Sequence, residues 1–223
     1  MTMRTLSPLE ARVLGVLIEK AHTVPDSYPL SLNSLTLGCN QKTARDPVIT
    51  AAEVEVQMAV DALKGLSLAF ESSGSRVTRY EHNMGRALNL PSQSVALLAA
   101  LLLRGPQTVS ELRINCERLH RFADLSAVEG FLDELAARPD EKGGPLVVKL
   151  ARQPGAREQR WMHQLCGAVD PGVASAGAEA QDFVATSEIA ALKQQQAALQ
   201  REVSELRSLV DKLYVELGVA RPI

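Results

Sequence analysis

The chain has 223 residues, of which 46% are hydrophobic and only 4% aromatic, and its 24 basic and 26 acidic side chains give a formal net charge of −2. This balance excludes the strongly basic composition of an obligate nucleic-acid-binding protein, so any basic surface must be local. Few aromatic residues and abundant Leu, Val and Ala favour helices over extensive sheet.

The start of the chain and its cysteines indicate a cytoplasmic protein. The first ten residues, MTMRTLSPLE, contain no apolar run of signal-peptide length. Cys39, Cys116 and Cys166 are too few and too far apart for a disulfide framework. The longest leucine-rich run, Val95 to Leu103, has about half the length of a membrane span. We therefore expect a buried helix there and no membrane association.

Four Ser/Thr-x-x-Glu patterns mark expected helix starts. In this capping box the hydroxyl accepts a hydrogen bond from a backbone amide of the first turn, and the glutamate reaches back to the cap. The pairs are Ser7 with Glu10, Thr50 with Glu53, Thr108 with Glu111, and Ser126 with Glu129. Pro8, at the first helical position after Ser7, strengthens the first of these predictions.

The chain contains an internal repeat. The segment PLSLNSLTLGC, from Pro29 to Cys39, aligns without gaps with PQTVSELRINC, from Pro106 to Cys116. Further on, the pattern Gly-x-Arg-x-x-Arg-aromatic-x-His occurs from Gly74 to His82 and again from Gly155 to His163. Each occurrence lies at the end of a segment that has the alternating apolar residues and the glycine-containing turn of a β-hairpin.

Each copy of the repeat therefore reads as three helices followed by a β-hairpin, which is the plan of a winged helix. We predict a mainly α fold with small β-hairpins (α+β), built of two tandem winged-helix domains at residues 5–88 and 90–166. The third helices are expected to start at Thr50 and Ser126. Tyr80 and Trp161 are expected to anchor the returning strand of each wing in the core.

The remaining chain is expected to form a flexible linker at 167–186 and a coiled-coil helix at 187–218. The linker is rich in Gly and Ala, and the helix has heptad a and d positions with Ile or Val at most a positions and Leu at every d position. This seam comprises Ile189, Leu192, Gln196, Leu199, Val203, Leu206, Val210, Leu213 and Leu217. The pattern predicts a parallel homodimer; the alternative is an amphipathic helix that folds back on its own chain.

The run CNQKTARDPV, from Cys39 to Val48, resembles a highly specific motif of the YceH-like family of uncharacterised bacterial proteins. The opening LSPLEARVLGVLIEK and the later EVQMAVDAL share this resemblance, which spans residues 5 to 166. It implies a tandem winged-helix fold, often with a C-terminal coiled coil, and no established activity. Nucleic-acid binding is suspected in that family mainly from the fold, which is an analogy.

Basic side chains gather beside the expected third helices rather than on them. The helices themselves carry mainly carboxylates, which disfavours reading of a major groove by both, and Gln57 is the one candidate base reader if it is not simply solvated. The candidate nucleic-acid contacts are Lys42, Thr43, Arg45, Gln57, Arg76, Arg79, Arg118, Arg121, Arg157 and Arg160. Most of these suit weak, phosphate-dominated contacts, including insertion of wing arginines into a minor groove.

Metal binding and catalysis are not expected. Cys116 with His120, and His163 with Cys166, have spacings compatible with zinc, but a buried thiol at the end of the second helix explains Cys116 more simply. The chain contains no phosphate-binding glycine loop, nucleophile elbow or zinc-protease motif. We therefore predict no catalytic residues and no cofactor.

Two functions remain open on the sequence. The first is a non-enzymatic, cytoplasmic tandem winged-helix protein that dimerises through its tail and binds DNA as a regulator or architectural factor. The alternative is a protein-interaction scaffold that uses the winged helices and coiled coil without DNA. Continuous positive charge over the third helix and wing would favour DNA, whereas an acidic or apolar surface there would favour a protein partner.

Overall fold

The structure is a computed structural model that describes residues 4–72 and 77–169. These residues form seven α-helices, two short 3-10 helices and two small antiparallel sheets, within one compact unit inside Met1–Ala174. The expected combination of helices with short strands is confirmed. Residues 170–186 of the expected linker, the coiled-coil seam and Arg76 lie outside the described residues. In the described ranges, no helix is both long and apolar enough to cross a membrane.

We call residues 5–88 the first half and residues 90–166 the second half. The first half contains, in order, α1 (Pro8–Thr23), η1 (Pro25–Ser27), β1 (Leu30–Ser31), α2 (Leu32–Cys39), α3 (Glu53–Gly65), β2 (Ala69–Ser72), β3 (Arg79–His82) and α4 (Met84–Ala87). Its sheet has the order β1-β3-β2 with antiparallel neighbours. Helix α1 starts with the predicted capping box, in which the Ser7 hydroxyl accepts from the Glu10 amide and Glu10 accepts from the Ser7 amide.

The second half repeats most of this order. It contains α5 (Ser92–Arg104), α6 (Val109–Asn115), α7 (Leu125–Ala136), η2 (Asp140–Lys142), β4 (Val147–Lys149) and β5 (Trp161–His163). Strands β4 and β5 pair antiparallel. The predicted capping box of Thr108 and Glu111 starts α6, and the leucine-rich run of α5 is buried as expected.

The repeat seen in the sequence is also a repeat of backbone pairing. Leu30 pairs with Tyr80 in the first half, and the aligned Gln107 pairs with Trp161 in the second half. In both halves the segment that precedes the second helix is thus hydrogen-bonded to the strand carrying the aromatic residue. Tyr80 and Trp161 are both buried, which confirms their role as anchors.

Two of the four predicted helix starts were wrong. Helix α3 starts after Ala52, whose amide donates to the Glu55 carboxylate, because Asn40 holds both backbone groups of Ala51 and keeps the preceding chain out of the helix. Helix α7 starts after Asp124, whose carboxylate accepts from the Ala127 amide at 2.7 Å. An ionised cap favours the positive end of a helix, so Asp124 is used in preference to Ser126.

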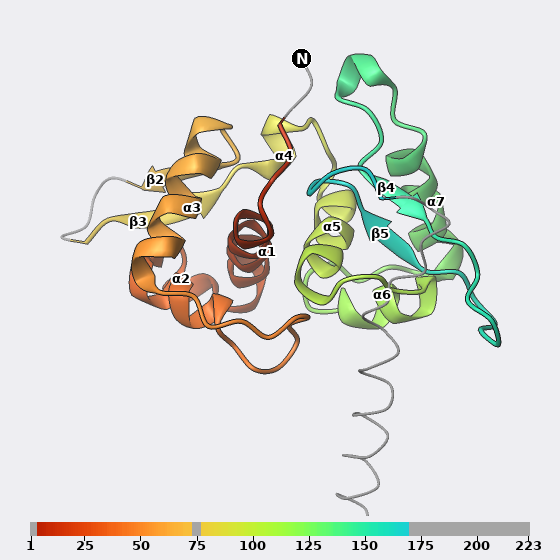
Figure 1. Cartoon of the computed structure of the whole chain (residues 1–223), viewed down its shortest axis with the longest axis horizontal. Coiled ribbons are helices and arrows are strands. Elements are labelled where there is room, and N and C mark those ends of the chain that lie inside the picture. The colour runs from red at the N-terminus through yellow and green to blue at the C-terminus, as the bar shows by residue number, and fades with distance from the viewer. Residues whose placement is uncertain (1–3, 73–76, 170–223) are drawn as a thin grey trace, which may run out of the picture. The chain divides into compact units, whose positions relative to one another are not determined.

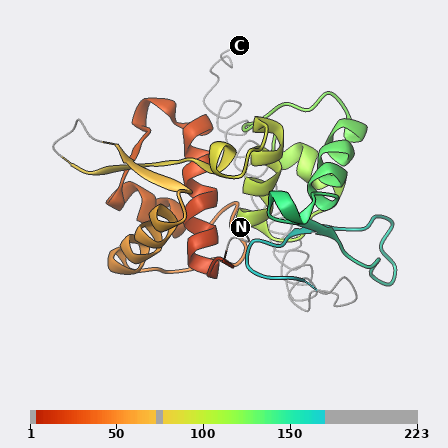
Figure 2. The same cartoon turned by 90° about the horizontal axis from the view of Figure 1, so that it is seen from above.

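The two halves share one hydrophobic core, which is centred on the packing of α1 against α5 (Figures 1 and 2). Gly15 makes this close approach possible, since a Cβ atom there would lie 2.9 Å from Cγ of Leu103. Two backbone hydrogen bonds also join the halves, from Asp46 to the Leu103 carbonyl and from Leu6 to the Leu165 carbonyl, each at 2.8 Å.

Candidate interaction surfaces

Arg45 does not face solvent, which corrects its expected role as a phosphate contact. Its side chain is fully buried, and both of its terminal nitrogens donate to the Glu19 carboxylate, at 3.0 and 2.6 Å. Its Nε also donates to the Gly38 carbonyl. Burial alone would raise the pKa of Glu19, but the hydrogen bonds and charge of Arg45, with the charge of Lys20, lower it overall. This bidentate pair fixes the loop against α1.

The other polar residues of the loop between α2 and α3 are mostly structural as well. Asn40 bridges to Ala51 through both ends of its amide, and Arg12 of α1 donates to the Cys39 and Pro47 carbonyls. The Asp46 amide donates to the Leu103 carbonyl of α5. The contacts of residues Cys39 to Val48 therefore attach this loop to α1 and to the second half. Lys42 and Thr43 remain exposed on the loop.

The wing arginines Arg79 and Arg160 occupy equivalent positions and make equivalent contacts. Arg79 donates to the Pro29 carbonyl at 2.7 Å, and Arg160 donates to the aligned Pro106 carbonyl at 3.3 Å. Arg160 also lies 3.4 Å from a Glu111 oxygen. These contacts tie the returning strand to the segment before the second helix, and insertion of either arginine into a minor groove would have to break them.

Gln57, the candidate base reader, is engaged by its neighbours. Its Oε1 accepts from the Tyr80 hydroxyl at 2.8 Å, and its amide donates to Asp61 at 3.1 Å. The first bond satisfies the polar atom of a buried aromatic side chain. Releasing Gln57 for a base would leave that hydroxyl without its partner, which disfavours Gln57 as a base reader.

The outer side of α3 carries two exposed apolar side chains that the sequence reasoning did not identify. Val54 and Met58 are four residues apart on one helix face and are 66% and 68% exposed, while Val56, Val60 and Leu63 form the buried face. Exposed Asp61 continues the same face. We call Val54, Met58 and Asp61 the α3 stripe. In the sequence EVEVQMAV, Val54 and Met58 form a second apolar pair four residues apart, in addition to the buried pair Val56 and Val60. This second pair is the signal that could have identified the stripe.

Helix α7 presents no such stripe. When the helices are aligned from their caps, Ala52 and Asp124, the buried Val56, Val60 and Leu63 match the buried Val128, Leu132 and Leu135. This alignment differs by four residues from the one that the capping patterns had suggested. In this alignment Ser126, Gly130 and Asp133 of α7 match Val54, Met58 and Asp61 of the α3 stripe. The second half therefore has small and polar residues where the first half has Val and Met.

The second half retains free basic side chains. Arg118 and Arg121, which follow α6, and Arg157, which lies between β4 and β5, are all exposed. Within the described ranges, no carboxylate forms an ion pair with any of these three arginines. Lys149, by contrast, pairs with Glu129 at 3.6 Å and lies over the Trp161 ring. The three arginines and Lys42 are the basic candidates that remain accessible.

The thiols and imidazoles do not form a reactive cluster. Cys39 and Cys116 are buried at equivalent positions, and burial raises the pKa of each thiol to about 12. Burial likewise lowers the pKa of His82 and of His163 to about 4, so both imidazoles are neutral near pH 7. Across the described part of the chain, no three His, Cys, Asp or Glu residues are grouped to hold a metal ion.

Comparisons with known proteins find similarity to bacterial proteins of unknown function. A family model described as "Protein of unknown function, DUF480" matches residues 6–156. A UPF0502 protein of Burkholderia pseudomallei (strain K96243) is 63% identical over 217 residues, covering 97% of this chain and 91% of the relative. A UPF0502 protein of Burkholderia thailandensis is 61% identical with the same coverage.

Proposed function

The chain belongs to the DUF480 family of proteins of unknown function, and we propose that it is a non-enzymatic tandem winged-helix protein whose first half binds a partner protein. The repeated order of three helices and a strand pair supports the winged-helix assignment. The α3 stripe carries the functional part of the proposal. In a winged helix this third helix is the element that would enter a DNA groove.

The chemistry of α3 favours protein over DNA. Val54 and Met58 offer apolar surface beside the exposed carboxylates of Glu53, Glu55 and Asp61, of which Asp61 is paired with Lys64 at 3.4 Å. Carboxylates repel phosphates, and large exposed apolar side chains gain most from burial against a second protein. Charge complementarity specifies the partner as a segment with an apolar face flanked by Lys or Arg, such as a basic amphipathic helix.

A photo-crosslinking experiment tests this proposal directly. Met58→benzoylphenylalanine in cells should yield an adduct to a basic amphipathic segment of another protein, and adding Val54→Ser should reduce the yield. Gly130→benzoylphenylalanine, at the matched position of α7, is the control and should give only background. An adduct to DNA, to residues 187–218 of this chain, or none above the control would contradict the proposal.

DNA binding by the second half is the second candidate function. The exposed side chains of Arg118, Arg121 and Arg157, which form no ion pair with the described residues, favour it, since such groups suit phosphate contacts. Lys42 and Thr43 are the corresponding exposed residues of the first half. With a net charge of −2 for the chain, this affinity is expected to be weak and strongly salt-dependent.

We also propose that residues 187–218 join two copies in the cytoplasm as a parallel coiled coil. The heptad pattern of the sequence supports this, and two copies would present two α3 stripes to partners. Light scattering at micromolar concentration should give a dimer for the full chain and a monomer for a chain ending at residue 186. A monomeric full chain would exclude the dimer.

A further inference from the structure

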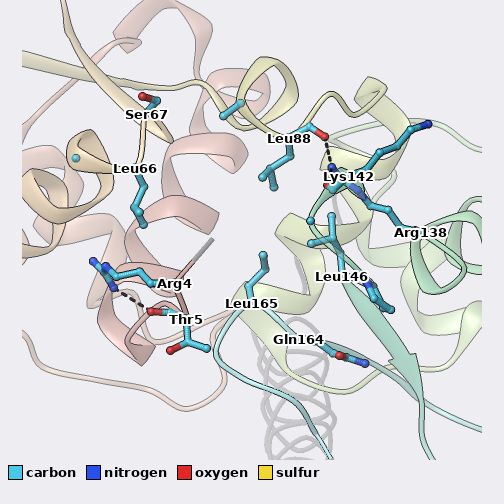
Figure 3. Close-up of a pocket in the computed structure, with 14 residues that line it drawn as sticks. Arg4, Thr5, Leu66, Ser67, Leu88, Arg138, Lys142, Leu146, Gln164 and Leu165 are labelled. Atoms are coloured by element: carbon cyan, nitrogen blue, oxygen red, sulfur yellow. Dashed lines mark hydrogen bonds between the residues drawn. The ribbon is translucent and has the colours of Figure 1, made fainter. Parts of the chain in front are cut away.

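A cavity of about 620 Å³ lies where the two halves meet (Figure 3). Leucines contribute much of its wall: Leu66 and Leu88 come from the first half, and Leu146 and Leu165 from the second. The volume is typical of small-molecule sites, and the lining combines these leucines with polar side chains such as Arg138 and Gln164. Such a site usually has a few polar groups that orient the ligand, so the polar side chains of the lining are informative.

Arg138, which follows α7, is the lining residue that has a buried side-chain atom without a hydrogen-bond partner among the described residues. Its Nη2 donates to the Leu88 carbonyl at 2.7 Å and to the Lys142 carbonyl, which fixes the guanidinium at the edge of the cavity (Figure 3). Its Nη1 is buried and has no hydrogen-bond partner among the described residues. Burial lowers the pKa of the Arg138 guanidinium, as expected for a charge removed from water.

The lining supplies no negative charge to balance Arg138. None of the described residues that line the cavity is Asp or Glu. Arg4 also lines it, but its two terminal nitrogens are already paired with Glu10, at 2.9 and 2.8 Å. A partly desolvated guanidinium with a free donor and no carboxylate is a position that an anion would stabilise.

We propose that this cavity binds an amphipathic carboxylate, with the carboxylate beside the Arg138 guanidinium and the apolar chain along the four leucines. A guanidinium suits a carboxylate because its donors are planar and directed, and the leucines would remove an alkyl chain from water. The ligand would contact both halves together, so its binding should stabilise their junction. This site is separate from the α3 stripe and does not depend on the function proposed for it.

Calorimetric titration of the full chain with octanoate tests the proposal. Octanoate should bind, whereas acetate, which lacks the chain, and octanol, which lacks the charge, should each bind at least about tenfold more weakly. Arg138→Gln should weaken octanoate binding by about tenfold or more, since it removes a charged hydrogen bond. Arg86→Gln, which removes a nearby exposed charge outside the lining, is the matched control and should bind like the wild type.

A second variant keeps the test decisive if Arg138→Gln fails to fold. Ala87 lines the cavity and is exposed, so Ala87→Phe fills space without removing any hydrogen bond of Arg138. It should also abolish octanoate binding while circular dichroism and thermal unfolding stay close to wild type. Absence of octanoate binding to the wild type, equal binding by octanol, or unchanged binding by both variants would overturn the proposal.

Discussion

The two halves keep the same buried positions but differ in what they expose. Val56, Val60 and Leu63 have buried counterparts in α7. At the three exposed positions of the α3 stripe, by contrast, only the aspartate is the same in α7. The loop cation Arg45 is turned inward onto Glu19, whereas Arg118 and Arg121 of the second half face solvent. A duplicated framework can thus retain its packing while its surfaces become suited to different partners, because exposed positions contribute little to stability.

The largest difference between the halves should appear when the buried ion pair is broken. Glu19→Ala leaves the fully buried Arg45 without its carboxylate and should lower the free energy of unfolding by about 3–5 kcal/mol. Glu129→Ala removes the exposed partner of Lys149 and should cost at most about 1 kcal/mol. Urea unfolding measures both, and equal losses would contradict the contrast between the pairs.

The same ion pair has a defined pH dependence. Because the folded-state pKa of Glu19 is lowered, its contribution to stability is present above the ordinary carboxyl pKa and is lost as pH falls through the folded-state value. The wild type should therefore lose more stability on acidification than a Glu19→Gln variant does. Unfolding curves at a series of pH values provide the comparison.

The junction between halves should be sensitive to one methyl group. Gly15→Ala forces Leu103 to move, since the new Cβ would lie 2.9 Å from its Cγ, and should destabilise the chain by about 1–3 kcal/mol. Gly130→Ala in α7 meets nothing within 4 Å and should stabilise by about 0.5–1 kcal/mol through helix propensity. Thermal unfolding of the pair separates packing from propensity, and stabilisation by both would show that the junction tolerates the methyl group.

The caps of the third helices should respond in opposite directions. Asp124→Ala removes a side-chain cap of α7 and should cost about 1 kcal/mol, whereas Ala52→Asp introduces a cap for α3 and should stabilise by a similar amount. Ser126→Ala should change stability by less than about 0.5 kcal/mol. A larger loss for Ser126→Ala than for Asp124→Ala in urea unfolding would restore the helix start expected from the sequence.

The smallest expected effect is a change in the salt dependence of DNA binding. If the second half contacts phosphates, Arg118→Gln with Arg121→Gln should reduce the slope of log affinity against log salt by about 2, since each contact contributes about 0.9. Arg79→Gln should leave the slope unchanged, because that side chain is bonded to the Pro29 carbonyl. Fluorescence anisotropy with a duplex measures the slopes, and no binding by the wild type at low salt would exclude this function.

The backbone was more predictable from the sequence than the interaction surfaces. The starts of α1 and α6, the buried helix α5 and the anchors Tyr80 and Trp161 were expected correctly, because periodicity, proline position and capping chemistry act between near neighbours. The starts of α3 and α7 were misplaced where another nearby side chain competed with the hydroxyl cap. Among the candidate nucleic-acid contacts, Lys42, Arg118, Arg121 and Arg157 are exposed, whereas Arg45 is buried.

The sequence by itself determined the repeat, the order of the main helices and paired strands, and the positions of the anchors, since these follow from local pattern. Only the tertiary structure decided that Arg45 forms a buried ion pair with Glu19 and that Arg138 borders a cavity between the halves. It also decided that Arg79 and Arg160 donate to the Pro29 and Pro106 carbonyls. The physical reason is that the role of a charged side chain depends on which groups surround it, and for these arginines the decisive partners lie far along the chain.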